Sequence, residues 1–271
     1  MPNAPVSRDK QVVAAPQRYD AWRSLRGEAD DTPQTLFEHL NELRKRLFRA
    51  ITALVVGVLA SAVFTSSILR YLIRPYGEQL QVLGPTESVV MYFRVALLSG
   101  AILAIPYITL QLFLFVAPGL TRKEKRWIYL ALPATTALFL IGVAFAWFIM
   151  VPAALGFLQD FESEIFKAEW TAERYISFLT SILFWIGVAF EMPVVVFVLA
   201  RLGIVGPQPL IRNWRLAVVL ITVAAALITP TVDPFNMLLV IAPLIVLYLL
   251  SIGLAMVAYP RALRAGSRAR R

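Results

Sequence analysis

The sequence has no cysteine and a single histidine, His39. Without cysteine there is no disulfide framework, thiol nucleophile or thiolate metal site. One histidine cannot supply the two imidazole ligands of an HExxH zinc site, and it lies outside the apolar runs where an intramembrane Ser-His hydrolase would need it. A phosphate-binding glycine loop is also absent. We therefore expect no metal, no cofactor and no enzymatic activity.

Charged residues are scarce as well. They make up 16% of the chain against 59% hydrophobic residues, and the mean hydropathy is +0.69, whereas soluble domains usually carry about 25% charged residues. These values exclude a disordered chain, a collagen-like chain and an ordinary cytosolic enzyme. In their place the sequence has long runs almost without charge, of the length that spans a membrane: 50–69, 95–121, 127–159, 175–200, 216–232 and 234–260.

The runs predict an all-α, polytopic membrane protein with six transmembrane helices. We expect spans near 50–69, 95–117, 127–150, 175–200, 214–228 and 235–259, with the last two helices short and the sixth interrupted by Pro243. A helix of 15 residues, as in the fifth span, covers only about 22 Å of a hydrocarbon core of about 30 Å. Prolines 106, 133, 152, 193 and 243 lie in or near the spans and predict kinks.

The ends of the chain differ from this domain. Residues 1–34 are polar, lack an apolar core segment and predict a flexible extension rather than a cleaved signal. Thr35 and Glu38 fit a capping box, and leucines at 36, 40, 43 and 47 follow at helical spacing, so we expect an amphipathic lead-in helix on the membrane surface before span one. The domains expected are thus 1–34, the transmembrane domain 35–260 and a basic tail, 261–271.

The positive charge of the chain is concentrated on one predicted face. Six spans put both termini on the same side, and that side holds 21 of the 26 lysines and arginines. By the positive-inside rule it is cytoplasmic. The formal net charge of +9 then records orientation and contact with lipid headgroups, and we expect no nucleic-acid partner.

Glu191 is the one acid inside a predicted span. A carboxylate there costs several kcal/mol unless it is paired, protonated or facing water. It could be a structural group hydrogen-bonded by Gln111. Alternatively, it could contact a substrate, an ion or the transmembrane helix of a partner, and Pro193, which weakens the helix two residues on, favours such a site.

Two further carboxylates, Glu42 and Glu124, lie within basic segments of the predicted cytoplasmic face. Such carboxylates could each receive a guanidinium group by a bidentate bond. Spacing alone allows simpler roles. Glu42 could pair with Arg46 at i,i+4, and Glu124 could cap the start of span three after Thr121.

The motifs around these residues resemble those of the TatC family, the polytopic subunit of the twin-arginine protein translocase. The resemblance covers about residues 36–260 and rests on five blocks in the expected order: Glu38-His-Leu-Asn-Glu-Leu-Arg-Lys-Arg46, Arg74-Pro75, Phe115-Val-Ala-Pro-Gly-Leu-Thr-Arg-Lys-Glu124, Phe190-Glu-Met-Pro193 and Thr229-Pro-Thr-Val-Asp233. The last block is spaced differently from the usual form of this turn, so no role for Asp233 is carried over.

The resemblance implies a glove-shaped receptor in the cytoplasmic (inner) membrane, with both termini cytoplasmic. It would bind the twin-arginine signal peptides of folded precursor proteins, and it would work in an oligomeric complex driven by the proton gradient. By position, Glu42 and Glu124 would meet the paired arginines, and Arg44, Arg46 and Phe115 would shape that surface. Glu191, with Gln111, would be the intramembrane contact for single-span TatA- and TatB-type partners. The alternative is a secondary transporter with Glu191 as its proton or ion site.

Overall fold

The computed structural model describes residues 36–77, 79–116, 122–165, 169–229 and 233–259. The chain divides into two units, Met1–Asn41 and Glu42–Arg271. The contacts between helices described below lie within the second unit. The predicted extension, the basic tail and the two predicted capping residues Thr35 and Thr121 lie outside the described residues. The elements are α2 (Leu36–Ala62), α3 (Thr65–Ile73), α4 (Glu87–Val116), α5 (Arg122–Phe145), the π-helix η2 (Ala146–Met150), α6 (Val151–Asp160), α7 (Ala172–Arg201), α8 (Pro207–Arg212), α9 (Trp214–Ile228) and α10 (Pro234–Ala258).

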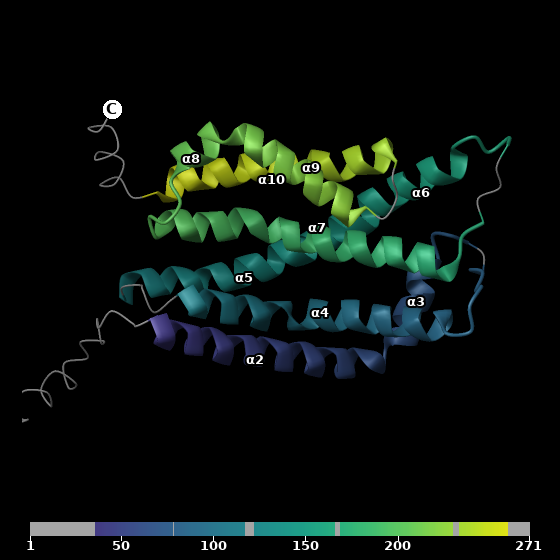
Figure 1. Cartoon of the computed structure of the whole chain (residues 1–271), viewed down its shortest axis with the longest axis horizontal. Coiled ribbons are helices and arrows are strands. Elements are labelled where there is room, and N and C mark those ends of the chain that lie inside the picture. Colours follow the sequence, from purple (N-terminus) through teal and green to yellow (C-terminus); the bar gives the residue numbers. More distant parts are fainter. Residues whose placement is uncertain (1–35, 78, 117–121, 166–168, 230–232, 260–271) are drawn as a thin grey trace, which may run out of the picture. The chain divides into compact units, whose positions relative to one another are not determined.

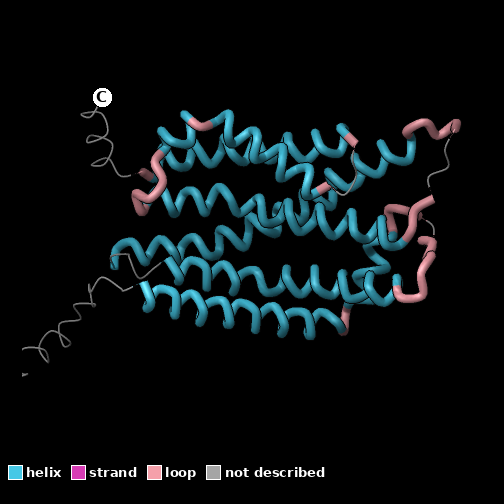
Figure 2. The backbone as a smooth tube through the Cα atoms, viewed as in Figure 1, coloured by secondary structure: helices cyan, strands magenta, loops and turns pink. Residues whose placement is uncertain are grey.

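The all-α class predicted from the sequence is confirmed. Within the described ranges the chain forms helices and loops, with one isolated parallel bridge between Gln81 and Thr171 and no strand (Figure 2). Four helical stretches are long and apolar enough to cross a membrane, and α2 with α3 forms a bent pair that would make a fifth. The remaining predicted span is α9, whose 15 residues match the expected short fifth span. The expectation that the last helix is also short is wrong, because α10 continues through Pro243 for 25 residues. Each apolar run of the sequence therefore corresponds to one helix or to consecutive helices.

Two expectations about the first span are wrong. The lead-in is not a separate surface helix, because α2 runs without a break from Leu36 to Ala62. Nor does the span continue straight to residue 69, because α3 is bent by 75° from α2. At the bend the hydroxyl of Ser61 donates to the carbonyl of Ala96 in α4, and Thr65 donates to the carbonyl of Ser61. Hydroxyl groups that insert into the backbone ladder in this way are a known cause of kinks.

The third span is longer than predicted and contains a wide turn. Helices α5, η2 and α6 follow one another directly from Arg122 to Asp160. Pro152 stands at the start of α6, and its missing N–H removes one donor from the preceding turn. Single π-turns within α-helices are typical where the regular ladder is interrupted.

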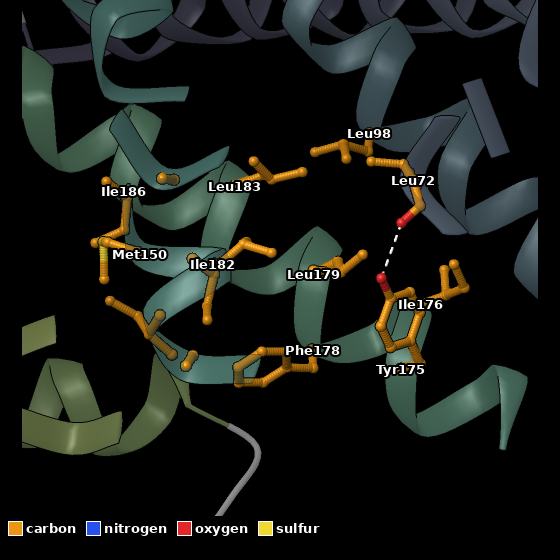
Figure 3. Packing of buried hydrophobic residues seen from close by; sticks show 14 of the residues in the cluster. Leu72, Leu98, Met150, Tyr175, Ile176, Phe178, Leu179, Ile182, Leu183 and Ile186 are labelled. Atoms are coloured by element: carbon orange, nitrogen blue, oxygen red, sulfur yellow. Dashed lines mark hydrogen bonds between the residues drawn. The ribbon is translucent and has the colours of Figure 1, made fainter. Parts of the chain in front are cut away.

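Helix α7 forms the centre of the second unit and contacts α4, α5, η2, α9 and α10. Figure 3 shows its buried side chains, among them Ile182 and Ile186, packed in the main cluster, with the Tyr175 hydroxyl donating to the Leu72 carbonyl at 2.9 Å. α5 lies close to α7 at two glycines. A methyl group on Gly142 would approach the Phe190 ring to 2.7 Å, and one on Gly187 would approach Phe139 to 2.8 Å. Small residues that let helices approach are the usual basis of packing in lipid.

At one end of the second unit, the loop before α4 is tied to the loop before α7. Ala172 donates its N–H to the Gln81 carbonyl at 2.8 Å, and the rings of Tyr76 and Trp170 stack with centroids 5.5 Å apart. The carboxylate of Glu87 accepts from the N–H groups of Leu83 and Glu173 at 2.8 and 2.7 Å. A carboxylate that sits on exposed N–H groups at the start of α7 also complements the helix dipole. These contacts fix the start of α4 and the start of α7 relative to each other.

Candidate functional site

A polar cluster joins the first half of α2 to the last turns of α4. Arg46 donates to Glu42 Oε1 at 3.1 Å and to Gln111 Oε1 at 3.2 Å, so one guanidinium bridges two helices. The side chains of Glu42 and Arg46 are each 20% exposed, and Gln111 is buried at 4%. The i,i+4 pair that spacing allowed is thus formed. Because water is partly excluded, its attraction is screened less than that of a pair on an open surface.

The other residues predicted for this surface lie differently. Phe115 is half-buried one turn beyond Gln111 on α4, on the same side of the helix. Arg44 is exposed and its guanidinium lies 5.8 Å from the centre of the Phe48 ring. Residues two apart on a helix point to different faces, so Arg44 and Arg46 do not act on one spot. The side chain of Glu124, near the start of α5, lies outside the described residues.

A second polar cluster lies within the bundle, between α4 and α7. Glu191 is 9% exposed, and its two carboxylate oxygens accept from Thr109 Oγ1 at 3.4 and 3.3 Å. The expected hydrogen bond to Gln111 is not formed among the described residues, because Gln111 points to α2 and bonds Arg46. Thr109 was missed by sequence reasoning. The available signal was that its hydroxyl follows Pro106 in a span with few polar groups.

The surroundings of Glu191 leave backbone acceptors near it. Pro193 lies inside α7, which remains one continuous helix, and a proline has no N–H to donate to the carbonyl four residues before it. Phe190 is tilted against Phe145 of α5, with ring centroids 5.5 Å apart. The Glu191 carboxylate and the carbonyl four residues before Pro193 can therefore accept hydrogen bonds from a further donor, and hydrogen bonds within an apolar bundle have little competition from water.

Catalytic or metal chemistry has no support in these clusters. Within the described residues, no group of three or more acidic or histidine side chains could hold a metal ion. In the part of the chain that the structure describes, each cluster has one carboxylate, Glu42 or Glu191, with a donor bonded to it. Such a pair of sites can bind a cation or a hydrogen-bonding helix.

The Arg46 cluster and the Glu87 contacts lie at opposite ends of the second unit. The Arg46 cluster lies at the end where α4, α7 and α10 finish (Figure 1). At this end Arg201 of α7 donates to the carbonyl of Ala258 in α10 at 3.3 Å. Glu87 and Glu173, in the first turns of α4 and α7, meet at the other end.

Comparisons with known proteins agree with the motifs of the sequence. The family model described as Sec-independent protein translocase protein (TatC) matches residues 38–243. A TatC protein of Carboxydothermus hydrogenoformans is 36% identical over 86% of this chain and 97% of its own length. One of Synechocystis sp. is 34% identical over 83% of this chain and 89% of its own length.

A solved structure supports the fold as well. The crystal structure of a twin-arginine translocase receptor, TatC, is similar to this chain with a TM-score of 0.74 and 34% identity, over 82% of this chain and 99% of that one. The matched stretch includes both polar clusters, and the relatives are translocase components rather than enzymes. The chain therefore belongs to the TatC family of the Sec-independent protein translocase.

Proposed function

We propose that this chain is the signal-peptide receptor of its translocase. As a TatC protein it is a component of a Sec-independent translocase and assembles with other subunits. In the proposal, Glu42 and Glu124 bind the paired arginines of a twin-arginine signal peptide, while Arg44, Arg46 and Phe115 border that surface. The folded precursor protein is then passed on, and the proton gradient drives its export.

The observation that carries the proposal is the state of Glu42. Its carboxylate already accepts a guanidinium, and both side chains are largely shielded from water. A carboxylate in this setting binds a guanidinium more strongly than it would on an open surface. Phe115, one helical turn from Gln111, offers an apolar neighbour for the residues that flank the arginines.

A binding experiment with the full chain in lipid nanodiscs tests this role. A fluorescent signal peptide with two arginines is expected to bind more tightly than the same peptide with two lysines, since lysine cannot form the bidentate contact. Glu42→Gln and Glu124→Gln should each weaken the twin-arginine peptide and reduce that preference. Equal binding of both peptides by the wild-type chain, or unchanged binding in both variants, would refute the receptor role.

The partners in the membrane are proposed to be single-span TatA- and TatB-type subunits. Glu191 supports this. Among the described residues its carboxylate accepts from the hydroxyl of Thr109, and it can accept a further hydrogen bond from a partner helix. Gln111, first expected to share this contact, bonds Arg46 and is better placed for the signal-peptide surface. Co-purification of a co-expressed single-span subunit in mild detergent tests the assignment, and loss of that subunit in Glu191→Ala supports it.

The orientation follows from the distribution of charge. With the Arg46 end cytoplasmic, both termini and the basic loops lie on the cytoplasmic side of the cell membrane, in contact with anionic lipid headgroups. Family membership favours this translocase role over a secondary transporter built on Glu191. Accessibility of single cysteines, introduced at each end of this cysteine-free chain, checks the orientation.

A further inference from the structure

The Arg46 cluster has a consequence for how the proposed signal-peptide site is regulated. We infer that Arg46 is an internal competitor for Glu42, which an incoming arginine must displace, and that Gln111 is the group that holds Arg46 once it has been displaced. This inference rests on the proposed function. Arg46 then sets the affinity of the site, in addition to bordering it.

Among the described residues, the contact made by Arg46 uses one of the two carboxylate oxygens of Glu42. Arg46 donates to Oε1 of Glu42, and the same guanidinium donates through its other nitrogen to Gln111. A guanidinium from a peptide binds a carboxylate best through both oxygens at once. That geometry requires Oε1, so the peptide and Arg46 compete for one atom. Sharing Glu42 would leave two cations on one carboxylate where water is partly excluded, which is costly.

Gln111 makes the exchange possible without leaving Arg46 unpaired. Gln111 is 4% exposed, and its hydrogen bond to Arg46 comes from α4, not from the helix that carries Glu42. When the peptide takes Glu42, Arg46 keeps this neutral acceptor and only one of its two bonds breaks. Without Gln111, displacement would strand a partly buried cation, and the penalty for an unpaired charge is large.

Competition of this kind lowers the apparent affinity for every ligand of Glu42. The apparent dissociation constant rises by the inverse of the fraction of molecules in which Glu42 is free. Ion pairs that are accessible to solvent contribute about 0.2–1 kcal/mol, so removing Arg46 is expected to tighten peptide binding roughly two- to fivefold.

A pair of matched variants isolates the competition from the loss of charge. Arg46→Met keeps the apolar stem and removes the guanidinium, and Lys45→Met removes one positive charge from the neighbouring exposed position. The dissociation constant of the twin-arginine signal peptide is measured for both in nanodiscs. We expect Arg46→Met to bind about two- to fivefold more tightly than Lys45→Met. Arg46→Lys keeps the positive charge but loses the planar guanidinium. Its dissociation constant should lie between those of wild type and Arg46→Met, and it takes the place of Arg46→Met if that variant does not fold.

A double-mutant cycle tests the role of Gln111. Gln111→Met should weaken peptide binding in the wild-type background and have no effect when Arg46 is already Met. The inference is overturned if Arg46→Met binds no more tightly than Lys45→Met, or if Gln111→Met has the same effect in both backgrounds. Each of these results can occur while wild type still prefers two arginines to two lysines, in which case the proposed function stands. Loss of that preference would overturn both.

Discussion

The contact between α2 and α4 predicts a large effect from the smallest possible side chain. Gly100 of α4 faces the backbone of α2, and a methyl group placed on it would lie 2.5 Å from both the N and the Cα of Val58. Carbon atoms in favourable contact are about 3.5–4.0 Å apart. Gly100→Ala therefore increases the separation of the two helices by about 1 Å. Backbone atoms cannot rotate away as the end of a side chain would.

The size of the effect follows from two opposing terms. Overpacking of this kind costs about 1–3 kcal/mol, whereas replacing a helical glycine by alanine contributes up to about 1 kcal/mol of helix stability. Gly253→Ala in α10 is the matched control, because a methyl group there meets nothing within 4 Å. The helix term is common to both variants. We therefore expect Gly100→Ala to be less stable than Gly253→Ala by about 1–3 kcal/mol.

Equilibrium unfolding in mixed micelles, with increasing SDS and tryptophan fluorescence as the signal, measures this difference. The separation of the helices should also disturb the Arg46 cluster, because its bond to Gln111 is already 3.2 Å long and joins the same two helices. Gly100→Ala should therefore weaken twin-arginine peptide binding as well. If Gly100→Ala proves as stable as Gly253→Ala, the close approach of α2 and α4 is wrong.

Three other contacts give predictions for the same unfolding assay. Tyr175→Phe removes the buried hydrogen bond to the Leu72 carbonyl and should cost about 1–3 kcal/mol. Asp233→Ala removes the side-chain cap of α10 and should cost about 1 kcal/mol, with Asp233→Asn close to wild type. Thr109→Val leaves the Glu191 carboxylate without its hydroxyl donor and should be destabilising, whereas Thr109→Ser should restore stability. Equal stability of the Val and Ser variants would contradict the contact.

The helices were predictable where apolar runs end in prolines, glycines or charges. Helix α9 has the bounds expected from its run, Trp214–Ile228. Helix α4 starts at Glu87, although the sequence suggested a start at residue 95 after Arg94. Arg94 is exposed, and a long cationic side chain near a helix end can reach the interface without ending the helix. Charge therefore marks where a span leaves the apolar core, not where its helix stops.

The polar clusters were predictable only in their local parts. The Glu42–Arg46 pair is set by spacing along one helix, and it is formed as expected. The partner of Glu191 depends on how α4 is rotated against α7, and nothing in the spacing of one chain fixes that rotation. Gln111 was the expected partner on α4, but the packing places Thr109, two residues before it, against Glu191.

Helix α4 carries one member of each polar cluster, and this determines how variants can be interpreted. Thr109 and Gln111 are two residues apart, so their side chains point to different faces of the helix, the first to α7 and the second to α2. The two clusters share no hydrogen-bond partner among the described residues. A change at Gln111 therefore acts directly on the Arg46 cluster, and a change at Thr109 acts directly on Glu191, despite their proximity in sequence. Effects that cross from one cluster to the other must pass through α4 itself, as a shift or rotation of a rigid helix.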